Sequence, residues 1–258
     1  MSKRPAEPPS HPAEPEIDRL GPTRRPAERP VMYQGWKHLL FLHWALPPEV
    51  VAPLLPPGLT LDTFEGRAWV GLVPFTVRGV RLRGLPAVGF LSDFHETNVR
   101  TYVHHEGGNP GVWFFSLEAA NAIAVRLARA WFKLPYHYAS MELTRQGESF
   151  SYRSERRWPG PTPATCAVRC TPRGPASTST PGTLQHFLVE RYFLYSTANG
   201  VLFRGQVHHP PYQVRGANVE GLDESLLAAA GIPRPPEPPL ALFSEGVDVD
   251  VFRLRRVE

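Results

Sequence analysis

The sequence predicts an α+β fold built on a large antiparallel sheet or barrel-like core with two main helices. Many short runs rich in β-branched and aromatic residues follow one another at close spacing, separated by clusters of Gly, Pro and Asn. Only two stretches, 119–132 and 183–193, have the composition and capping residues of substantial helices. No repeat and no internal boundary is visible in residues 32–258, so we predict one domain there.

The N-terminal segment is expected to be a disordered, proline-rich tail. Residues 1–31 contain no aromatic residue, many prolines and interleaved charges of both signs. Such a segment buries too little apolar area to offset the entropy lost on ordering.

The first elements of the domain lead to a hairpin and a helix. A short helix is expected at 47–55, ended by Pro56, and a long strand at 67–77, where Pro74 indicates an edge or a bulge. Strands at 94–103 and 112–117 form a hairpin around a glycine-rich turn. Ser116 or Glu118 is expected to cap the helix over 119–132, which Pro135 ends.

The second half alternates more regularly. The expected elements are strands at 138–145, 149–157 and 164–171, a flexible loop at 173–182, a helix capped by Thr183 through about 193, strands at 201–209 and 212–220, a short helix at 224–230, a polyproline connector at 233–239, and a last strand at 248–257.

Composition narrows the functional classes. The 258 residues hold 28 Lys+Arg against 24 Asp+Glu, a balance too mild and dispersed for a nucleic-acid-binding stripe. No apolar run reaches the length of a membrane span, and the N-terminus lacks the apolar core of a secretory signal. Cys166 and Cys170, about 13 Å apart on one strand, are beyond disulfide reach. We expect free thiols and a cytoplasmic protein without a membrane partner.

A candidate site lies on the strand 94–103. Glu96, Asn98, Arg100 and Tyr102 alternate at period two, so their side chains leave one face of the sheet. The next strand, 112–117, is apolar on both faces, which is typical of a strand covered on both sides. Two interpretations stay open: the polar face lines an interior pocket, or it is an ordinary solvated face.

Several motifs resemble the YqjF-like family of uncharacterised proteins, which belongs to the acetoacetate-decarboxylase-like superfamily. They are Trp36–Trp44, Leu54–Leu59, Gly66–Phe75, Asn98–Tyr102, Gly111–Leu117 and Glu190–Tyr195. The resemblance spans about residues 32–258. It implies a closed or nearly closed β-barrel-like core around an interior pocket.

The resemblance also implies which chemistry to look for. Decarboxylases of the superfamily form a Schiff base on one lysine, whose pKa a second lysine lowers. In the matching segment 131–137, Tyr136 and His137 stand in place of that lysine pair. Glu96 matches the superfamily's active-site glutamate. Lys133 follows Arg126 and Arg129 on a helical stripe that is more typical of a solvated face. We therefore expect the pocket without acetoacetate decarboxylase activity.

The remaining groups support acid/base chemistry. A desolvated Glu96 would have a raised pKa and act as a general acid or base, whereas an ion pair with Arg100 would lower that pKa. Arg100 could instead orient a ligand carboxylate. His137 and Tyr136 are candidate proton carriers, or simply a buried aromatic pair. Asn98, Tyr102 and Asn121 are further candidate ligand-binding residues.

Other classes are disfavoured. His208 and His209 point to opposite faces of a strand, no third ligand is apparent for them, and we predict no metal site despite His104 and His105. No phosphate loop, GxGxxG or GxSxG motif occurs, and we predict no cofactor. The leading hypothesis is a pocket protein acting on a small organic or keto acid. The alternatives are a ligand-binding module without turnover, and a structural protein with a filled pocket; homo-oligomerisation stays open.

Overall fold

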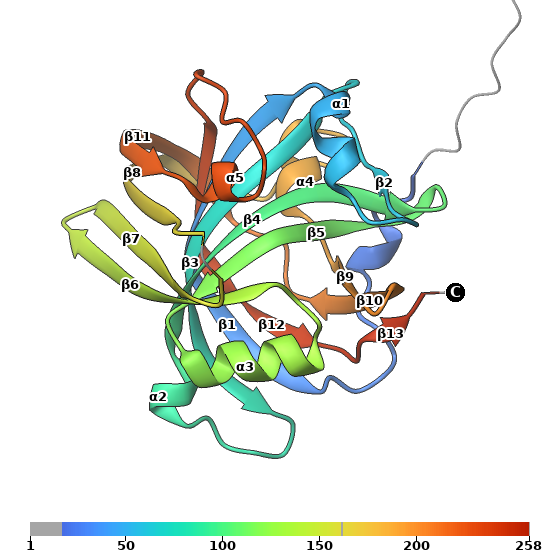
Figure 1. The fold of residues 1–258 in the computed structure, drawn as a ribbon. Helices are drawn as coiled ribbons and strands as arrows, with labels where there is room; N and C mark the ends of the chain where they lie inside the picture. The colour runs from blue at the N-terminus through green and yellow to red at the C-terminus, as the bar shows by residue number, and fades with distance from the viewer. Residues whose placement is uncertain (1–16, 161, 258) are drawn as a thin grey trace, which may run out of the picture.

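The computed structural model describes residues 17–160 and 162–257. Within them, a single mixed sheet dominates and short helices lie at its ends (Figure 1). The strands are β1 (Met32–Leu46), β2 (Thr60–Leu61), β3 (Ala68–Leu82), β4 (Phe94–His105), β5 (Gly108–Ala119), β6 (Tyr136–Gln146), β7 (Ser149–Trp158), β8 (Thr165–Ser177), β9 (Phe193–Ala198), β10 (Val201–His208), β11 (Val214–Glu224), β12 (Leu240–Val251) and β13 (Arg255–Arg256). The helices are α1 (Pro48–Val51), α2 (Gly89–Ser92), α3 (Ala122–Trp131), α4 (Leu184–Val189) and α5 (Leu226–Ala229), with 3-10 turns η1 (Gly21–Thr23) and η2 (Ala52–Leu54).

The strand pairings close the sheet into two barrel-like rings that share a wall. The larger ring runs β1-β3-β4-β5-β6-β7-β8-β11-β12 and back to β1. The smaller ring leaves the wall at β5, passes through β9 and β10, and returns to β12. The shared wall is β12-β1-β3-β4-β5. All pairings are antiparallel except β5–β6 and β5–β9, which are parallel. The barrel-like core is thus confirmed, but the sheet is mixed.

The shared wall is apolar on both faces because each ring encloses its own core. Side chains of β1 alternate between them: Leu40 and Leu42 pack in the larger ring, whereas Leu39 and Phe41 pack in the smaller one. A strand covered on both faces reads as a continuous apolar run, which explains the composition of β1 and β3.

An irregularity in β1 changes which of its side chains face the smaller ring. His38 has a φ of 51° and Gly246, on the neighbouring strand β12, has a φ of 132°. A Cβ at residue 246 would overlap the carbonyl oxygen of Trp36, so only glycine fits there. Pro74 lies where the β1–β3 register shifts, as the sequence indicated. Trp36 and Leu39 are three positions apart and would face opposite sides of a regular strand. Because of the irregularity between them, both line the same cavity.

Several element boundaries differ from the sequence-based expectation. Strands β1 and β9 were not predicted, and β8 continues through Ser177 into the segment expected to be a flexible loop. Strand β5 runs to Ala119, so α3 begins only at Ala122. The last expected strand, 248–257, is instead the end of β12 followed by β13. Thr183 caps α4 as predicted, accepting a hydrogen bond from the backbone N–H of His186 at 3.3 Å.

The segment before β1 differs in part from the predicted disordered tail. Residues 1–16 of the predicted tail lie outside the described residues. Residues 17–31 pack on the domain: Arg19 pairs with Asp62, Arg25 pairs with Asp250 at 2.6 Å, and the backbone N–H of Val31 bonds Val251. This part of the segment is therefore not a free tail, because its charges find partners on the domain.

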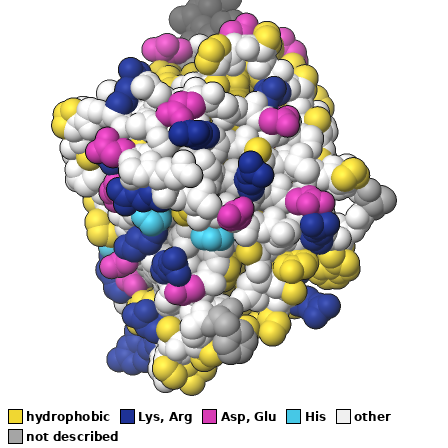
Figure 2. All heavy atoms as spheres, turned by 90° about the vertical axis from the view of Figure 1, so that its left-hand side faces the viewer, with side chains coloured by type: hydrophobic (Ala, Val, Ile, Leu, Met, Phe, Trp, Pro, Cys, Tyr) yellow, Lys and Arg dark blue, Asp and Glu magenta, His cyan; other side chains and the backbone are white. Residues whose placement is uncertain are grey.

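The surface carries mixed charge. On the face seen in Figure 2, Lys and Arg side chains are interspersed with Asp and Glu side chains rather than gathered into a basic stripe. In the described part of the chain, no helix has the length and hydrophobicity that a membrane crossing requires.

Candidate ligand cavity

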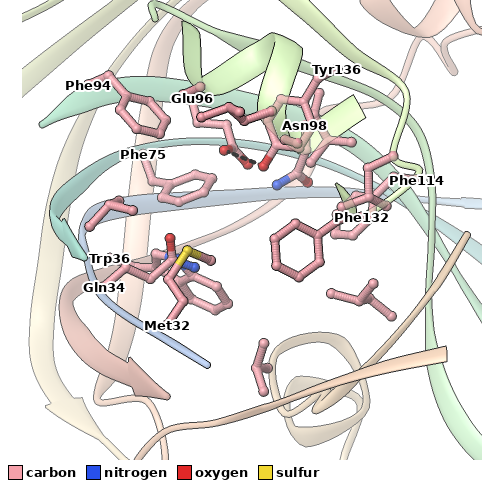
Figure 3. A pocket seen from close by; sticks show the side chains of 18 of the residues that line it. Met32, Gln34, Trp36, Phe75, Phe94, Glu96, Asn98, Phe114, Phe132 and Tyr136 are labelled. Atoms are coloured by element: carbon pink, nitrogen blue, oxygen red, sulfur yellow. Dashed lines mark hydrogen bonds between the residues drawn. The ribbon is translucent and has the colours of Figure 1, made fainter. Parts of the chain in front are cut away.

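A cavity of about 470 Å³ lies within the smaller ring. This volume is in the range of small-molecule sites. Aromatic and aliphatic side chains form most of its lining, among them Trp36, Phe75, Phe94, Phe114 and Phe132 (Figure 3). Its polar lining residues include Glu96, Asn98, Arg100 and Tyr136. Glu96, Asn98 and Arg100 of the strand face singled out in the sequence therefore line a cavity and are not on a solvated surface.

Glu96 is the central ionisable group of this cavity. Its side chain is almost completely buried, with 4% of its surface exposed. Desolvation raises its pKa to about 8; hydrogen bonds from Tyr136 and Asn98 act in the opposite direction, and the nearby Glu118 adds to the rise. Burial outweighs both donors, so the carboxyl group is largely protonated at neutral pH.

Two partners hold the Glu96 carboxyl group. The Tyr136 hydroxyl, at the start of β6, donates to Oε2 of Glu96 at 2.9 Å (Figure 3). Asn98, two residues along β4, hydrogen-bonds the same carboxyl group through its side chain. Asn98 is 4% exposed, and its Oδ1 atom has no hydrogen-bond partner among the described residues. A buried acceptor without a partner is unusual in proteins and points to a ligand donor.

Arg100 is not paired with Glu96. Its Nη2 atom donates to the carbonyl oxygen of Leu188 at 3.0 Å, and its buried Nε atom has no partner among the described residues. Within the described residues, no carboxylate lies within salt-bridge distance of Arg100. The alternative in which an ion pair with Arg100 lowers the Glu96 pKa is therefore wrong.

Tyr102 supports the fold rather than the cavity. Its hydroxyl donates to the carbonyl oxygen of Leu188 at 2.7 Å and lies 2.6 Å from Nε2 of His43. Because the hydroxyl proton is used on Leu188, His43 must donate through Nε2. Tyr102 is completely buried in the core of the smaller ring and is not among the cavity-lining residues.

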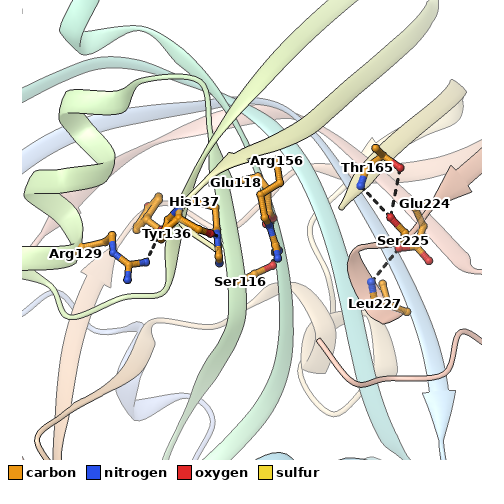
Figure 4. A network of polar contacts seen from close by, with 11 residues as sticks. Ser116, Glu118, Arg129, Tyr136, His137, Arg156, Thr165, Glu224, Ser225 and Leu227 are labelled. Atoms are coloured by element: carbon orange, nitrogen blue, oxygen red, sulfur yellow. Dashed lines mark hydrogen bonds and ion pairs between the residues drawn. The ribbon is translucent and has the colours of Figure 1, made fainter. Parts of the chain in front are cut away.

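His137 faces away from the cavity. Successive residues on a strand point to opposite faces, so Tyr136 reaches Glu96 and His137 cannot. The His137 ring instead has Nδ1 3.0 Å from the carbonyl oxygen of Pro159, beside the ion pair of Glu118 and Arg156 (Figure 4). Burial, followed by the charge of Arg156, lowers its pKa to about 4. The expectation that His137 shares the pocket with Glu96 is wrong.

Asn121, Lys37 and Lys133 do not line the cavity. Asn121 caps α3, its Oδ1 accepting from the backbone N–H groups of Ile123 at 3.1 Å and Ala124 at 3.0 Å. It replaces the expected caps Ser116 and Glu118, which belong to β5. Among the described lining residues there is no lysine. Lys37 pairs with Asp248 at 3.2 Å on the outside, and exposed Lys133 bonds the carbonyl oxygen of Ala130.

Sequence reasoning missed much of the apolar lining. Ile123, Leu127 and Trp131 recur every four residues on α3, a spacing that was visible in the sequence. Trp36 faces the cavity only because of the irregularity at His38, which no sequence pattern indicated. No group of three His, Cys, Asp or Glu residues in the described chain is arranged to hold a metal ion. Cys166 and Cys170 are free, as predicted, and both are buried.

Comparison with known proteins agrees with this fold. The DUF2071 family of uncharacterized conserved proteins matches residues 33–248. The uncharacterized protein YqjF of Bacillus subtilis (strain 168) is 35% identical over 226 residues, which cover 88% of this chain and 92% of that protein.

Two solved structures share the architecture at low identity. Acetoacetate decarboxylase from Legionella pneumophila subsp. pneumophila str. Philadelphia 1 aligns with a TM-score of 0.60 at 14% identity, covering 92% of this chain and 94% of that one. The enduracididine biosynthesis enzyme MppR, complexed with the condensation product of pyruvate and imidazole 4-carboxaldehyde, aligns with a TM-score of 0.61 at 13% identity, covering 89% and 90%. The fold is therefore acetoacetate-decarboxylase-like.

Proposed function

The chain belongs to the YqjF-like DUF2071 family, and we propose that it binds a small organic or keto acid and moves a proton on it by non-covalent acid/base catalysis. The observation that carries this proposal is the buried Glu96 carboxyl group, held by Tyr136 and Asn98 inside a largely apolar cavity. A group with a pKa of about 8 can donate and accept a proton near neutral pH.

Schiff-base chemistry is not part of this proposal. A lysine nucleophile must reach the substrate carbonyl, and the described cavity lining contains none. At the position that the family resemblance assigns to the lysine pair lies Tyr136. Burial raises the pKa of Tyr136 well above its usual value, so its hydroxyl stays a neutral hydrogen-bond donor. Borohydride treatment in the presence of a 3-oxo acid should leave the protein mass unchanged. A covalent adduct on Lys133 or Lys37 would overturn this point.

The expected reaction is a proton transfer beside a carbonyl group. Glu96 would exchange a proton with the carbon next to the carbonyl, and the unpartnered Oδ1 of Asn98 would accept a hydrogen bond from the enol hydroxyl. Interconversion of keto and enol forms balances without a second substrate, because one proton leaves carbon and one joins oxygen. A cytoplasmic location, supported by two free buried thiols, belongs to the same proposal.

The test is solvent exchange of carbon-bound hydrogen. We expect the wild-type protein in D₂O to speed deuterium uptake next to the carbonyl of 2-oxo or 3-oxo acids, followed by proton NMR. Glu96→Gln should reduce this rate at least a hundredfold. Tyr33→Phe, which changes a tyrosine that is not among the cavity-lining residues, should not change it. Equal rates in wild type and Glu96→Gln would refute the catalytic role.

One observation favours binding without turnover as a second function. Since His137 faces away, Glu96 is the only described lining residue that titrates near neutral pH. A ligand that binds without measurable exchange would favour this function. The open volume beside Glu96 argues against a purely structural protein with a filled pocket.

A further inference from the structure

The polar and apolar parts of the cavity are separated along its length, and this separation identifies a class of ligand. We infer that the cavity takes an amphipathic monocarboxylate, with its carboxylate at Arg100, its chain passing Glu96 and an unbranched apolar tail reaching the cavity mouth. The mouth is formed by α3 and residues 82–88. The inference rests on the proposed function of the same cavity and specifies its substrate.

Strand β4 gives the order of the polar groups. Glu96 pairs with Ala119 at the end of β5, immediately before α3, whereas Arg100 pairs with Phe114 farther along. Four residues of strand separate the Cα atoms of Glu96 and Arg100 by roughly 13 Å. Both side chains line the cavity, with Asn98 between them. Arg100 therefore marks the end remote from the mouth, and Glu96 lies nearer to it.

Arg100 supplies a cation that the protein does not neutralise. The other arginine deep in this ring, Arg191, is bound to Asp62 at 2.7 Å. The nearby Glu190 is occupied by the Tyr192 hydroxyl at 2.7 Å and the Tyr212 backbone N–H at 2.9 Å. The guanidinium of Arg100 instead bonds neutral oxygens through Nη2 and leaves Nε without a partner among the described residues. A ligand carboxylate satisfies both its charge and its geometry.

The mouth is largely apolar and uncovered, although the exposed Arg81, next to residues 82–88, also lines the cavity. Ile123, Leu127 and Trp131 form a stripe on α3 and line the cavity while 49%, 61% and 51% exposed, respectively. Leu85 and Val88 line the same mouth and are 58% and 46% exposed. Such a concentration of exposed apolar side chains is unusual on a soluble surface and marks a binding site.

The apolar stripe on α3 is continuous with the cavity lining. This favours the apolar tail of a bound ligand over a protein partner as the group that covers the stripe. Phe94 and Phe132 line the same cavity as the stripe, so the apolar lining is continuous with it. The charged side of α3 points elsewhere: Arg126 and Arg129 lie over the Trp158 ring at 5.6 and 5.9 Å. A single ligand can therefore cover the stripe and reach Arg100.

The experiment measures binding, not turnover. Isothermal titration calorimetry would compare straight-chain carboxylates from butanoate to dodecanoate with the primary alcohols of the same length. We expect Kd to fall roughly fourfold per added methylene until the chain passes the mouth. Each carboxylate should bind roughly tenfold or more tightly than its alcohol, and Arg100→Gln should abolish that preference.

Surface variants test the mouth without disturbing the core. Leu127→Gln should weaken binding of the long acids severalfold and leave butanoate unchanged. The matched control is Leu20→Gln, since Leu20 is 50% exposed and outside the cavity. If Arg100→Gln does not fold, the affinities of the wild-type protein for carboxylates and alcohols of the same length test by themselves whether a carboxylate is recognised.

The outcomes separate this inference from the proposed function. Length-dependent binding of acids without deuterium exchange would support the ligand class and refute the catalysis. Exchange on short keto acids with no dependence of Kd on chain length would refute the ligand class alone. If binding shows no length dependence and Leu127→Gln dissociates a dimer in sedimentation velocity, the stripe is a subunit interface and the inference is overturned.

Discussion

The Tyr136 hydroxyl on β6 donates a 2.9 Å hydrogen bond to the Glu96 carboxyl group on β4, joining residues 40 positions apart. The two strands do not pair with each other; β5 lies between them and pairs with both. The parallel β5–β6 pairing places Tyr136 opposite Leu117, and Glu96 lies opposite Ala119 on the other edge of β5. This register brings the phenol over β5 to the carboxyl group.

Removing this hydrogen bond should raise the Glu96 pKa further. The Tyr136 hydroxyl favours the charged carboxylate, so Tyr136→Phe removes a factor that lowers the pKa. We expect a rise of roughly one unit, measured by carbon-13 NMR of the glutamate side-chain carboxyl, with Glu96→Gln identifying the signal. Tyr33→Phe is the matched control and should leave that signal in place; an unchanged pKa in Tyr136→Phe would contradict the assigned role.

Glu96 should make stability depend on pH. Its pKa is raised from 4.5 to about 8 by folding, so the folded protein holds the proton more tightly than the unfolded chain. The stabilisation is complete below the unfolded value and is lost as pH rises through the folded value. Urea unfolding between about pH 5 and 9 should show wild type losing up to a few kcal/mol relative to Glu96→Gln. A difference between the two proteins that does not change with pH would exclude the raised pKa.

The buried ion pair outside the cavity should be important for stability. Glu118 is fully buried and Arg156 is 7% exposed, and Nε of Arg156 donates to Glu118 at 3.0 Å (Figure 4). Arg156→Leu leaves a buried carboxylate without its partner and should cost about 3–5 kcal/mol in urea unfolding. Arg157→Leu is the control, because its pair with Glu155 is about half exposed and should contribute less than about 1 kcal/mol. If the two variants lose similar amounts of unfolding free energy, burial of the ion pair does not determine its contribution to stability.

The shared wall allows the two cores to be perturbed separately. Leu39 and Leu42 lie three residues apart on β1 and are both buried, but only Leu39 lines the cavity. Each alanine substitution should destabilise the fold by about 2–5 kcal/mol. Only Leu39→Ala should alter the affinity for a carboxylate ligand, measured by titration calorimetry. An equal change in affinity for Leu42→Ala would mean that the two cores are not independent.

Much of the fold followed from local patterns. Alternating runs predicted most strands, including those at 138–145 and 149–157, which pair as β6 and β7. Thr183 was recognised as a cap because its hydroxyl can reach the backbone of the next turn. Strand β1, which lies in the same doubly covered wall as the predicted strands β3 and β5, was not predicted.

The candidate site was predicted less evenly. Period two placed Glu96, Asn98 and Arg100 on one face, and that face lines the cavity. The same rule separates Tyr136 from His137, but local sequence does not say which of the two faces the cavity. Asn121 was a candidate ligand-binding residue within an expected helix over 119–132, but β5 continues to Ala119 and Asn121 caps α3.

The sequence by itself determined the family and the shared face of Glu96, Asn98 and Arg100. These follow from residue identity and from the geometry of a single strand. Only the tertiary structure decided that Tyr136 meets Glu96, that Arg100 stays without a carboxylate partner, and that the apolar side of α3 opens onto the cavity. Those relationships depend on which strands pair and in what register, because they join side chains from distant parts of the chain.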